Sequence, residues 1–372
     1  MMNSKDLKVA LVHDWLVAQR GGERVLMEMA RLFPDAPIFT LVYDAEKVDP
    51  FFHQRNIITT YIQNLPGAPI RFRPYLPLFP WAAESIDLQD FDLVISTSHC
   101  VVKGVRTPND AHHISYIHSP MRYAWDQMAS YLPAGLAGKI LYPFARCVTW
   151  PLRHWDRSSS DRPDTLLCNS HYVAQRIERF WRKQAQVLHP PVDIEFFAAA
   201  SSQPRQGYVV VSSLVPYKGV DLAIDAANKL GVSLNIVGDG PLFEAYKKRA
   251  GPTVRFLGLV GREKLREVYA RAEALWHCAV EDFGIVPIEA SAAGCPVIAL
   301  GCGGNLETVI PGINGAHFSE ASIEALCGTV EDFRRLPEEY FSPDKCQAHT
   351  QQFSTEAFVQ GLKTHVVQAG VS

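Results

Sequence analysis

The chain has 372 residues, with 36 Lys and Arg against 39 Asp and Glu, which leaves a formal net charge of −3. Hydrophobic residues make up 47% and charged residues 20%, an ordinary globular composition that excludes a disordered or fibrous chain. The near-neutral charge gives no support to a general nucleic-acid binder, which is normally basic. At roughly 150 residues per domain, this length predicts two domains.

The eight cysteines are scattered along the chain and contain no CxxC pair. We therefore expect reduced thiols, no structural zinc and no other metal site. The N-terminal stretch lacks a long apolar run behind a basic one, and no apolar stretch of about 20 residues is uninterrupted. These features predict a cytoplasmic protein, either soluble or attached to the inner face of the cytoplasmic membrane.

In the first half, short apolar runs alternate with helical patterns. Residues 9–13 read as a buried strand, and Gly21-Gly22 followed by a helical pattern completes the opening of a βαβ unit. Further buried strands are predicted at 93–96, 114–117 and 166–168. Two segments rich in aromatic and basic residues, 63–82 and 131–156, read as insertions in this half.

Around 190–207 a linker-like stretch with Pro190-Pro191 separates a second alternating series. Its predicted strands lie at 208–212, 234–237, 254–256, 274–277 and 297–300, and its helices at 221–230, 264–272 and 287–293. We expect two doubly wound α/β domains, 1–190 and 191–354, facing a shared cleft. In such sheets ligands bind beyond the carboxyl ends of the strands.

The most informative stretch is 280–290, where a predicted strand leads into a loop with Glu281 and then a helix with Glu289. Gly284 lets the backbone approach a ligand, and Pro287 suits the first helical turn, so Glu289 is predicted in that turn. Carboxylates accept hydrogen bonds from vicinal hydroxyls, and a ribose or hexose is a natural ligand. A capping Glu and a surface Glu explain the spacing equally well.

Three further features follow predicted strands. Lys218, before Gly219 at a helix start, suits a diphosphate, although a single Lys is usually a solvated charge. The Gly21-Gly22 pair admits a phosphate or makes a simple tight turn, and it lacks the GxGxxG dinucleotide pattern. His118 directly follows the strand 114–117 and suits a sugar hydroxyl, although a single His is more often structural.

Taken in order, these segments resemble the retaining, nucleotide-sugar-dependent glycosyltransferases of family 4, which have the GT-B fold. The matching pieces cover essentially the whole chain and include Leu214…Lys218-Gly219, Val237-Gly238-Asp239-Gly240-Pro241, Phe256-Leu257-Gly258, Glu281-Asp282-Phe283-Gly284…Glu289-Ala290 and Gly303-Gly304-Asn305. The stretch from Tyr116 to Asp126 is similar to the O-antigen and exopolysaccharide mannosyltransferases.

The resemblance implies a role for each matching residue. Its catalytic residues are His118 near the reacting carbon, Glu281 on the transferred sugar and Lys218 on the diphosphate. Its donor-binding residues are Gly21, Gly22, Ser213, Lys218, Gly238, Glu281, Phe283, Gly284, Ile285, Val286 and Glu289, with Glu289 on the ribose. Its acceptor-binding residues are Asp14, Arg122, Tyr123 and Asp126. The last helix, about 355–372, would cross back onto the first domain.

One position departs from the family pattern. Ser212-Ser213 stand where the family has Gly-Arg, and that Arg shares the diphosphate with the Lys. Either the Ser213 hydroxyl donates a hydrogen bond instead, or Arg24 or Arg262 supplies the missing charge.

The implied reaction is transfer of a hexose, mannose from GDP-mannose, to a lipid-linked or oligosaccharide acceptor in surface polysaccharide biosynthesis, with retention and without a metal or cofactor. The alternatives are a UDP-sugar donor (glucose, galactose or GlcNAc), a nucleotide-sugar epimerase, and a binding module without catalysis. The two insertions, with Arg71, Arg73, Lys139 and Arg146, either dock on an anionic membrane or cap the core.

Overall fold

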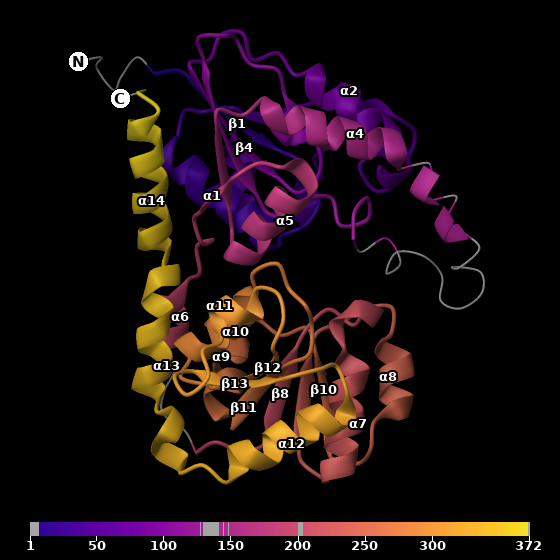
Figure 1. Cartoon of the computed structure of the whole chain (residues 1–372), viewed down its shortest axis with the longest axis vertical. Coiled ribbons are helices and arrows are strands. Elements are labelled where there is room, and N and C mark those ends of the chain that lie inside the picture. The colour runs from indigo at the N-terminus through magenta and orange to yellow at the C-terminus, as the bar shows by residue number, and fades with distance from the viewer. Residues whose placement is uncertain are drawn as a thin grey trace. The chain divides into compact units, whose positions relative to one another are not determined.

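The computed structural model describes residues 7–126, 128, 141–143, 145–147, 149–199 and 204–370 (Figure 1). The chain divides into two compact units. Unit 1 comprises Met1–Pro191 and Phe358–Ser372, and unit 2 comprises Val192–Ala357. Within the described ranges, every helix is too short or too polar to cross a bilayer.

Unit 1 is built on a parallel sheet whose seven described strands run in the order β3-β2-β1-β4-β5-β6-β7. The strands are β1 (Val9–His13), β2 (Ile38–Thr40), β3 (Ile57–Thr59), β4 (Leu93–Ser98), β5 (His112–Ile117), β6 (Thr165–Cys168) and β7 (Gln186–Val187). The α-helices are α1 (Gly21–Leu32), α2 (Phe79–Glu84), α4 (Trp150–Ser158), α5 (His171–Trp181) and the greater part of α14 (Thr355–Gln368). Short 3-10 helices include η4 (Arg73–Leu78) and η5 (Val102–Gly104).

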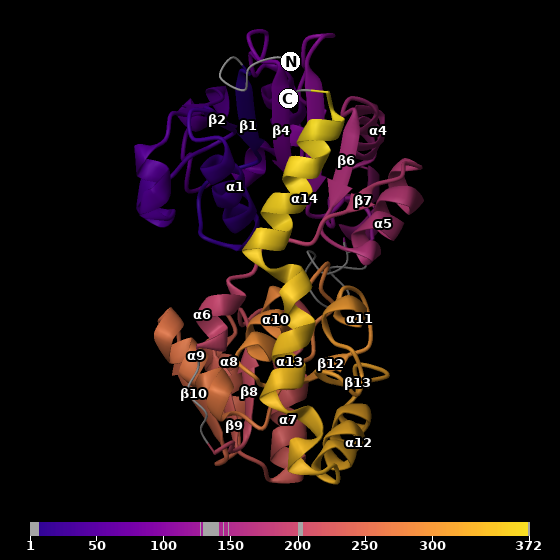
Figure 2. The ribbon, with the colours of Figure 1, turned by 90° about the vertical axis from the view of Figure 1, so that its left-hand side faces the viewer.

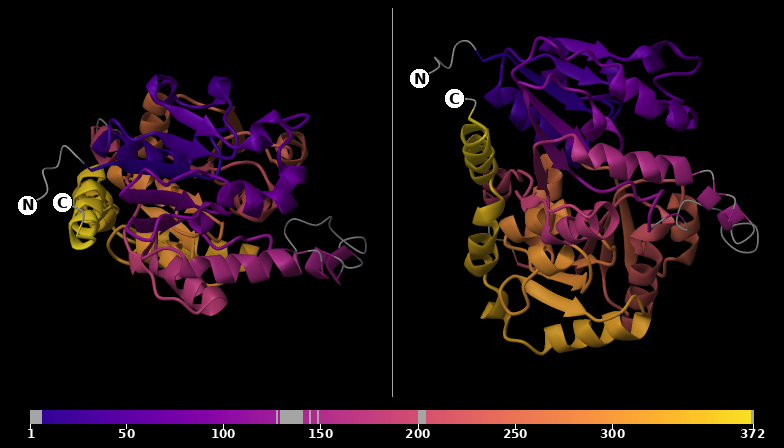
Figure 3. Two further views of the ribbon diagram at one scale, coloured as in Figure 1. Left: turned by 90° about the horizontal axis from the view of Figure 1, so that it is seen from above. Right: turned by 45° about the horizontal axis from the view of Figure 1, so that its top comes forward.

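Alternate residues of β1 point to opposite faces of this sheet, as the pleat requires. Val9 and Leu11 enter a core with α1 and α14, whereas Ala10 and Val12 enter a core with α2 and α4. Figure 2 shows α1 and α14 side by side in front of the strands, and Figure 3 shows magenta α4 and yellow α14 on different sides of them. Parallel sheets are stable when both faces are covered in this way.

The C-terminal helix α14 belongs to the core of unit 1. It contributes the apolar side chains Phe358, Leu362 and Val366, which are at most 8% exposed. The ring of Phe358 packs edge-on against Tyr116 of β5, with 5.8 Å between the ring centroids. The last helix therefore returns to the first domain, as the resemblance implied.

Unit 2 repeats the arrangement with six described parallel strands in the order β10-β9-β8-β11-β12-β13. The strands are β8 (Tyr208–Val211), β9 (Leu234–Val237), β10 (Val254–Gly258), β11 (Ala274–His277), β12 (Val297–Leu300) and β13 (Gly315–Phe318). The helices are α6 (Ile194–Ala198), α7 (Val220–Leu230), α8 (Phe243–Arg249), α9 (Arg262–Arg271), α10 (Ile285–Ala292), α11 (Asn305–Thr308), α12 (Ile323–Arg334) and α13 (Pro343–Thr350). Residues of α7, α8 and α12 cover one face, and residues of α6, α9 and α10 cover the other (Figure 1).

Two parallel, doubly wound sheets confirm the predicted fold class. The sequence patterns did not predict β2, β3, β7 or β13, because β2, β3 and β7 have three residues or fewer and β13 carries His317 between Ala316 and Phe318. The predicted start of α10 at Pro287 is wrong. The helix begins at Ile285, because Gly284 at its N-cap adopts a φ of 99°, so Pro287 is the third residue and Glu289 lies in the second turn.

The aromatic segment 63–82 is part of the core of unit 1. Phe72 and Phe79 are at most 3% exposed and stack with 6.1 Å between ring centroids, so this segment caps one face of the sheet. The segment 131–156 is described only in part, and Lys139 lies outside the described residues. All eight cysteines lie in described positions and are free thiols, and Cys147 and Cys302 are the exposed ones among them.

Candidate active site

Each sheet has a switch point at which the strand order reverses, between β1 and β4 in unit 1 and between β8 and β11 in unit 2. In doubly wound sheets, ligands bind at this point beyond the carboxyl ends of the strands. Lys218 follows β8 and Glu281 follows β11, whereas His118 follows β5, the neighbour of β4. The candidate residues therefore lie in two groups, one in each unit.

In unit 2, the side chains of Lys218 and Glu281 form an ion pair. Lys218 Nζ donates a hydrogen bond to Glu281 Oε1, and the two side chains are 20% and 15% exposed. Lys218 ends a 3-10 helix, η8 (Pro216–Lys218), and Gly219 then adopts a φ of 64°, where an added Cβ would lie 2.9 Å from Cys278 Cβ. This left-handed, close-packed glycine brings the lysine to β11.

His277, the last residue of β11, lies beside this pair. Its Nε2 atom is 3.9 Å from Glu281 Oε1, and the residue is 6% exposed. Burial lowers the pKa of His277 to about 4, so the imidazole is neutral at pH 7. The group thus combines a cation, a carboxylate and a neutral imidazole at one edge of the sheet.

The start of α10 follows Glu281 directly. Gly284 caps the helix, and Ile285 and Val286 supply N–H groups in a first turn, where such groups have no intrahelical partner. Phe283 is buried and packs on Phe353, with 5.4 Å between ring centroids, which anchors the loop. The Glu281 carbonyl accepts a 2.8 Å hydrogen bond from Gly304 N, so both ends of the loop are fixed.

Glu289 is buried within unit 2. It is 5% exposed, and its Oε2 atom accepts a 3.5 Å hydrogen bond from the hydroxyl of Tyr269 on α9. The carboxylate lies two residues further from the start of α10 than the sequence predicted.

Two other donor candidates lie on the loops after β8 and β9. Ser213 is exposed between β8 and η8. At Gly238, an added Cβ would lie 1.9 Å from the carbonyl oxygen of Ser212, so this position excludes every side chain. Gly238 therefore has a packing reason to be glycine that does not depend on a ligand.

The two proposed replacements for the family arginine are Arg262 and Arg24. Arg262 pairs with Asp193 at 2.5 Å and lies 4.2 Å above the ring centroid of Phe196. Arg24 lies in the first turn of α1, in unit 1. The guanidinium of Arg262 is therefore engaged at the start of α6.

In unit 1, two imidazoles converge on the bare backbone of Gly22. An added Cβ there would lie 3.4 Å from His118 Nε2 and 3.6 Å from His13 Cε1. His13 Nδ1 pairs with Thr97 Oγ1 of β4. Among the described residues, the buried Nε2 atoms of His13 and His118 have no hydrogen-bond partner.

Both imidazoles beside Gly22 are neutral at pH 7, because burial lowers the pKa of His13 and of His118 to about 3. A buried polar atom without a partner costs about 1–3 kcal/mol. The helix α1 begins at Gly21, and its first N–H groups carry partial positive charge. The imidazoles of His13 and His118 and the N–H groups at the start of α1 can therefore form hydrogen bonds with a ligand next to the backbone of Gly21 and Gly22.

Asp14 is fully buried beneath this group. Its Oδ2 accepts backbone N–H bonds from His99 and Cys100 at 2.6 and 2.8 Å, and its Oδ1 accepts them from Val101 and Val102 at 2.8 and 3.0 Å. The carboxylate thus holds the turn after β4 and does not reach the surface.

The other acceptor candidates lie on the loop after β5. Burial, together with the positive charge of Arg122, lowers the pKa of His99 to about 3, which puts Arg122 near the histidines. The Tyr123 hydroxyl contacts Cys100 Sγ at 2.9 Å, and Asp126 pairs with Arg176 at 2.6 Å. Arg122 therefore lies near the histidine group, whereas the side chains of Tyr123 and Asp126 hold the loop.

The structure adds residues that the sequence patterns did not single out, namely His13, Thr97, His99 and His277. His13 ends β1 and His277 ends β11, the same strand-end position that directed attention to His118. That signal was available in the sequence. Within the described residues, no three His, Cys, Asp or Glu side chains are grouped to hold a metal ion.

Comparison with known families matches both units. The family described as "Glycosyltransferase Family 4" matches residues 19–196, and the family described as "Glycosyl transferases group 1" matches residues 193–349. Each of the two units is thus similar to a glycosyltransferase family, and the two matches together span residues 19–349. The two matches overlap at residues 193–196, close to the boundary between the units at Pro191 and Val192.

Individual relatives agree with this family result. The GDP-mannose-dependent alpha-(1-6)-phosphatidylinositol monomannoside mannosyltransferase of Mycobacterium tuberculosis is 31% identical over 226 residues, which is 52% of this chain and 57% of that protein. The chain spans about half the length of the curated relatives it matches.

Two solved structures share the fold over nearly the whole chain. Anabaena HepE in complex with UDP and glucose has a TM-score of 0.65 at 18% identity, covering 97% of this chain and 99% of that one. The sucrose-phosphate synthase from Thermosynechococcus elongatus has a TM-score of 0.69 at 17% identity, covering 97% and 98%.

Proposed function

We propose that the chain is a retaining hexosyltransferase that transfers mannose from GDP-mannose to a hydroxyl group of a lipid-linked or oligosaccharide acceptor, in surface polysaccharide biosynthesis. The observation that carries the proposal is the Lys218–Glu281 pair at the switch point of unit 2. A lysine that can bind a diphosphate and a carboxylate that can bind sugar hydroxyls are hydrogen-bonded to each other there. The GDP-mannose-dependent relative supports the choice of donor.

The main catalytic task is to stabilise the negative charge that develops on the leaving diphosphate. Lys218 supplies a positive charge, and a lysine has three N–H donors, so it can hold Glu281 and a phosphate oxygen together. The first-turn N–H groups of Ile285 and Val286 add the positive end of the α10 dipole. In this mechanism the diphosphate is stabilised without a metal ion.

The sugar hydroxyls are assigned to Glu281 and His118. An ionised carboxylate accepts hydrogen bonds from two neighbouring hydroxyls, and a neutral imidazole either accepts or donates one. The low pKa of His118, about 3, keeps its imidazole neutral at every physiological pH. Glu289 is assigned to the donor ribose.

We also place the acceptor at an anionic membrane surface, as a polyprenyl-linked sugar. Unit 1 exposes the indoles of Trp81 and Trp150, which are 63% and 64% exposed on α2 and α4. These two helices are joined by a 2.8 Å hydrogen bond from Trp155 Nε1 to Glu84 Oε1. Exposed arginines, Arg71 among them, lie on the same segments, and indoles with basic side chains suit a lipid interface.

Two measurements on the purified protein test the proposal, namely thermal unfolding and nucleotide release in the presence of EDTA. Each compares GDP-mannose with UDP-glucose, UDP-galactose and UDP-GlcNAc. We expect GDP-mannose to raise the unfolding temperature most, because a bound ligand stabilises the fold by mass action. We expect release to persist in EDTA and the product to keep the donor's anomeric configuration by NMR.

Each other outcome contradicts a stated part of the proposal. Loss of release in EDTA would contradict the metal-free mechanism, and the strongest stabilisation by a UDP-sugar would contradict GDP-mannose. An epimerised nucleotide sugar formed without acceptor would point to an epimerase, and donor binding without turnover would point to a binding module.

A further inference from the structure

Unit 1 contains a buried ion pair that the proposed reaction does not use. Lys103 of η5 and Asp156 of α4 are 1% and 0% exposed, and Lys103 Nζ lies 2.5 Å from Asp156 Oδ1. The ammonium also lies 5.1 Å and 4.8 Å from the ring centroids of Trp155 and Trp181. A buried ion pair is often no more stabilising than apolar residues of the same volume, so this pair calls for a reason other than stability.

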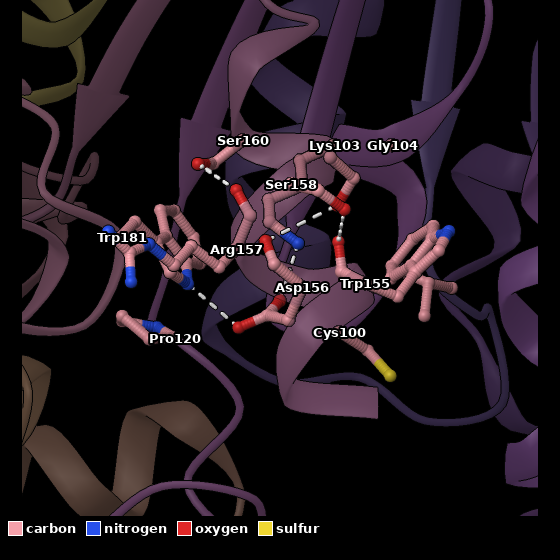
Figure 4. A network of polar contacts seen from close by, with 12 residues as sticks. Cys100, Lys103, Gly104, Pro120, Trp155, Asp156, Arg157, Ser158, Ser160 and Trp181 are labelled. Carbon is pink, nitrogen blue, oxygen red and sulfur yellow. Dashed lines mark hydrogen bonds and ion pairs between the residues drawn. The ribbon is translucent and has the colours of Figure 1, made fainter. Parts of the chain in front are cut away.

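The second carboxylate oxygen supplies that reason. Asp156 Oδ2 accepts two indole hydrogen bonds, from Trp125 Nε1 and from Trp181 Nε1, each of 2.7 Å. Figure 4 shows the Asp156 carboxylate between Trp181 and Lys103. Trp181 ends α5, but Trp125 lies on the loop after β5 that begins with His118. One carboxylate thus ties η5, α4 and α5 to that loop.

The near end of this loop is held by other contacts. Asn169 Nδ2 donates a 3.0 Å hydrogen bond to the carbonyl of His118, and Arg176 Nη1 donates a 2.5 Å hydrogen bond to Ser119 Oγ. At the far end, the Trp125 indole stacks on Phe180 with 4.9 Å between ring centroids. The neighbouring Asp126 pairs with Arg176 at 2.6 Å, and the indole N–H of Trp125 donates its hydrogen bond to Asp156.

The charge on Asp156 matters to this arrangement. An ionised carboxylate accepts on both oxygens, and it therefore satisfies Lys103 and two indoles at once. An asparagine at position 156 would turn its NH2 group toward Lys103 or toward the indoles. An NH2 group cannot accept a hydrogen bond, so at least one of these contacts would be lost.

We infer that Asp156 is a positioning residue, which fixes the Trp125 indole and thereby the loop 118–126 that carries His118 and Arg122. This inference rests on the proposed function, because it treats His118 as a residue that contacts the sugar. Lys103 acts by holding Oδ1 of the buried carboxylate, so that Oδ2 faces both indoles.

Trp125→Phe and Trp181→Phe are matched variants that test it. Each removes one indole N–H from the same oxygen, and each keeps an aromatic ring, but only position 125 lies on the loop. We expect amide hydrogen exchange in peptides covering 118–126 to be about tenfold faster in Trp125→Phe and unchanged in Trp181→Phe, with similar losses of thermal stability. We expect kcat for sugar transfer to fall about tenfold in Trp125→Phe alone, with the donor KM unchanged.

Equal hydrogen exchange of the loop in the two variants would overturn the inference, because Asp156 would then only stabilise unit 1. Equal kcat values, or a change in donor KM alone, would overturn it as well. Failure of the wild-type protein to transfer any sugar would refute the proposed function instead. The exchange comparison does not depend on activity and would still decide the role of Asp156.

Discussion

At the scale of single residues, a lysine and a glutamate with partly exposed side chains carry the proposed chemistry of unit 2. Their side chains are 20% and 15% exposed, so the loss of hydration offsets much of the attraction between the two charges. We therefore propose that the positions of Lys218 and Glu281 at the strand ends reflect ligand chemistry more than the stability of the fold. Activity and stability can be separated by substitution at Glu281.

Glu281→Gln keeps the side-chain shape and removes its charge. We expect kcat/KM for GDP-mannose to fall by roughly 10²-fold, because the sugar and Lys218 both lose an ionised partner in the transition state. We expect the unfolding temperature to change little. Nucleotide release and thermal unfolding measure the two effects.

Glu267→Gln is the matched control, because Glu267 pairs with Lys264 at 3.1 Å on the surface of α9. It should keep wild-type turnover. Full turnover by Glu281→Gln would remove Glu281 from the site.

At the scale of elements, the start of α10 supplies backbone N–H donors, whereas α2 and α4 cover the sheet of unit 1 and expose two indoles. Gly284 begins α10 two residues earlier than Pro287 suggested, and this puts two N–H donors directly after the Glu281 loop. The helices α2 and α4 cover one face of the unit 1 sheet with their apolar sides. They leave Trp81 and Trp150 exposed, which is the surface that we assign to the membrane.

Neutralising exposed arginines on the same two segments, 63–82 and 131–156, tests that assignment. We expect Arg71→Gln/Arg73→Gln/Arg146→Gln to lower co-sedimentation with phosphatidylglycerol vesicles at least about tenfold, because each basic residue near an anionic surface contributes about 1 kcal/mol. All three side chains are exposed, so the fold should be unaffected.

The control for this variant is Lys247→Gln/Lys248→Gln/Arg255→Gln, which removes the same charge from exposed positions of unit 2. It should co-sediment like the wild type. Equal binding by the two variants would show that these arginines do not direct the protein to lipid.

At the scale of the whole molecule, both units bury neutral histidines at or near the ends of their strands. Burial lowers the pKa of His13, His113 and His118 to about 3 and of His277 to about 4. The ordinary value is 6.5. In the unfolded chain these imidazoles take up protons near that value, whereas the folded chain excludes the protons until the lower pKa is reached.

The histidine contribution to the free energy of unfolding should therefore have its full value above pH 6.5, and it should decrease as the pH falls from about 6.5 toward about 4. Each such histidine contributes a slope of up to about 1.4 kcal/mol per pH unit. Urea unfolding at pH 7.5, 6.0 and 5.0 measures this dependence. His113→Gln replaces a buried imidazole that is bonded to Ser96 Oγ at 2.8 Å. This variant should reduce the slope of the free energy of unfolding against pH by the contribution of one histidine. An unchanged slope in this variant would contradict the assignment.

Local patterns were sufficient to predict much of the fold and to select candidate site residues. Apolar runs of three to five residues gave most strands, because a strand buried on both faces is apolar along most of its length. The rule that ligands bind beyond strand ends then directed attention to Lys218, Glu281 and His118. The same rule pointed to His13 and His277, which the patterns alone did not distinguish from core residues.

The sequence by itself determined two parallel α/β sheets and the strand ends at which polar residues collect. Only the tertiary structure decided which of those residues meet. The carboxylate of Asp14 is bound by backbone from His99 onward, and Lys103 pairs with Asp156. Parallel pairing joins strands through crossovers, so each contact depends on several elements docking together, and a local sequence pattern carries no record of that docking.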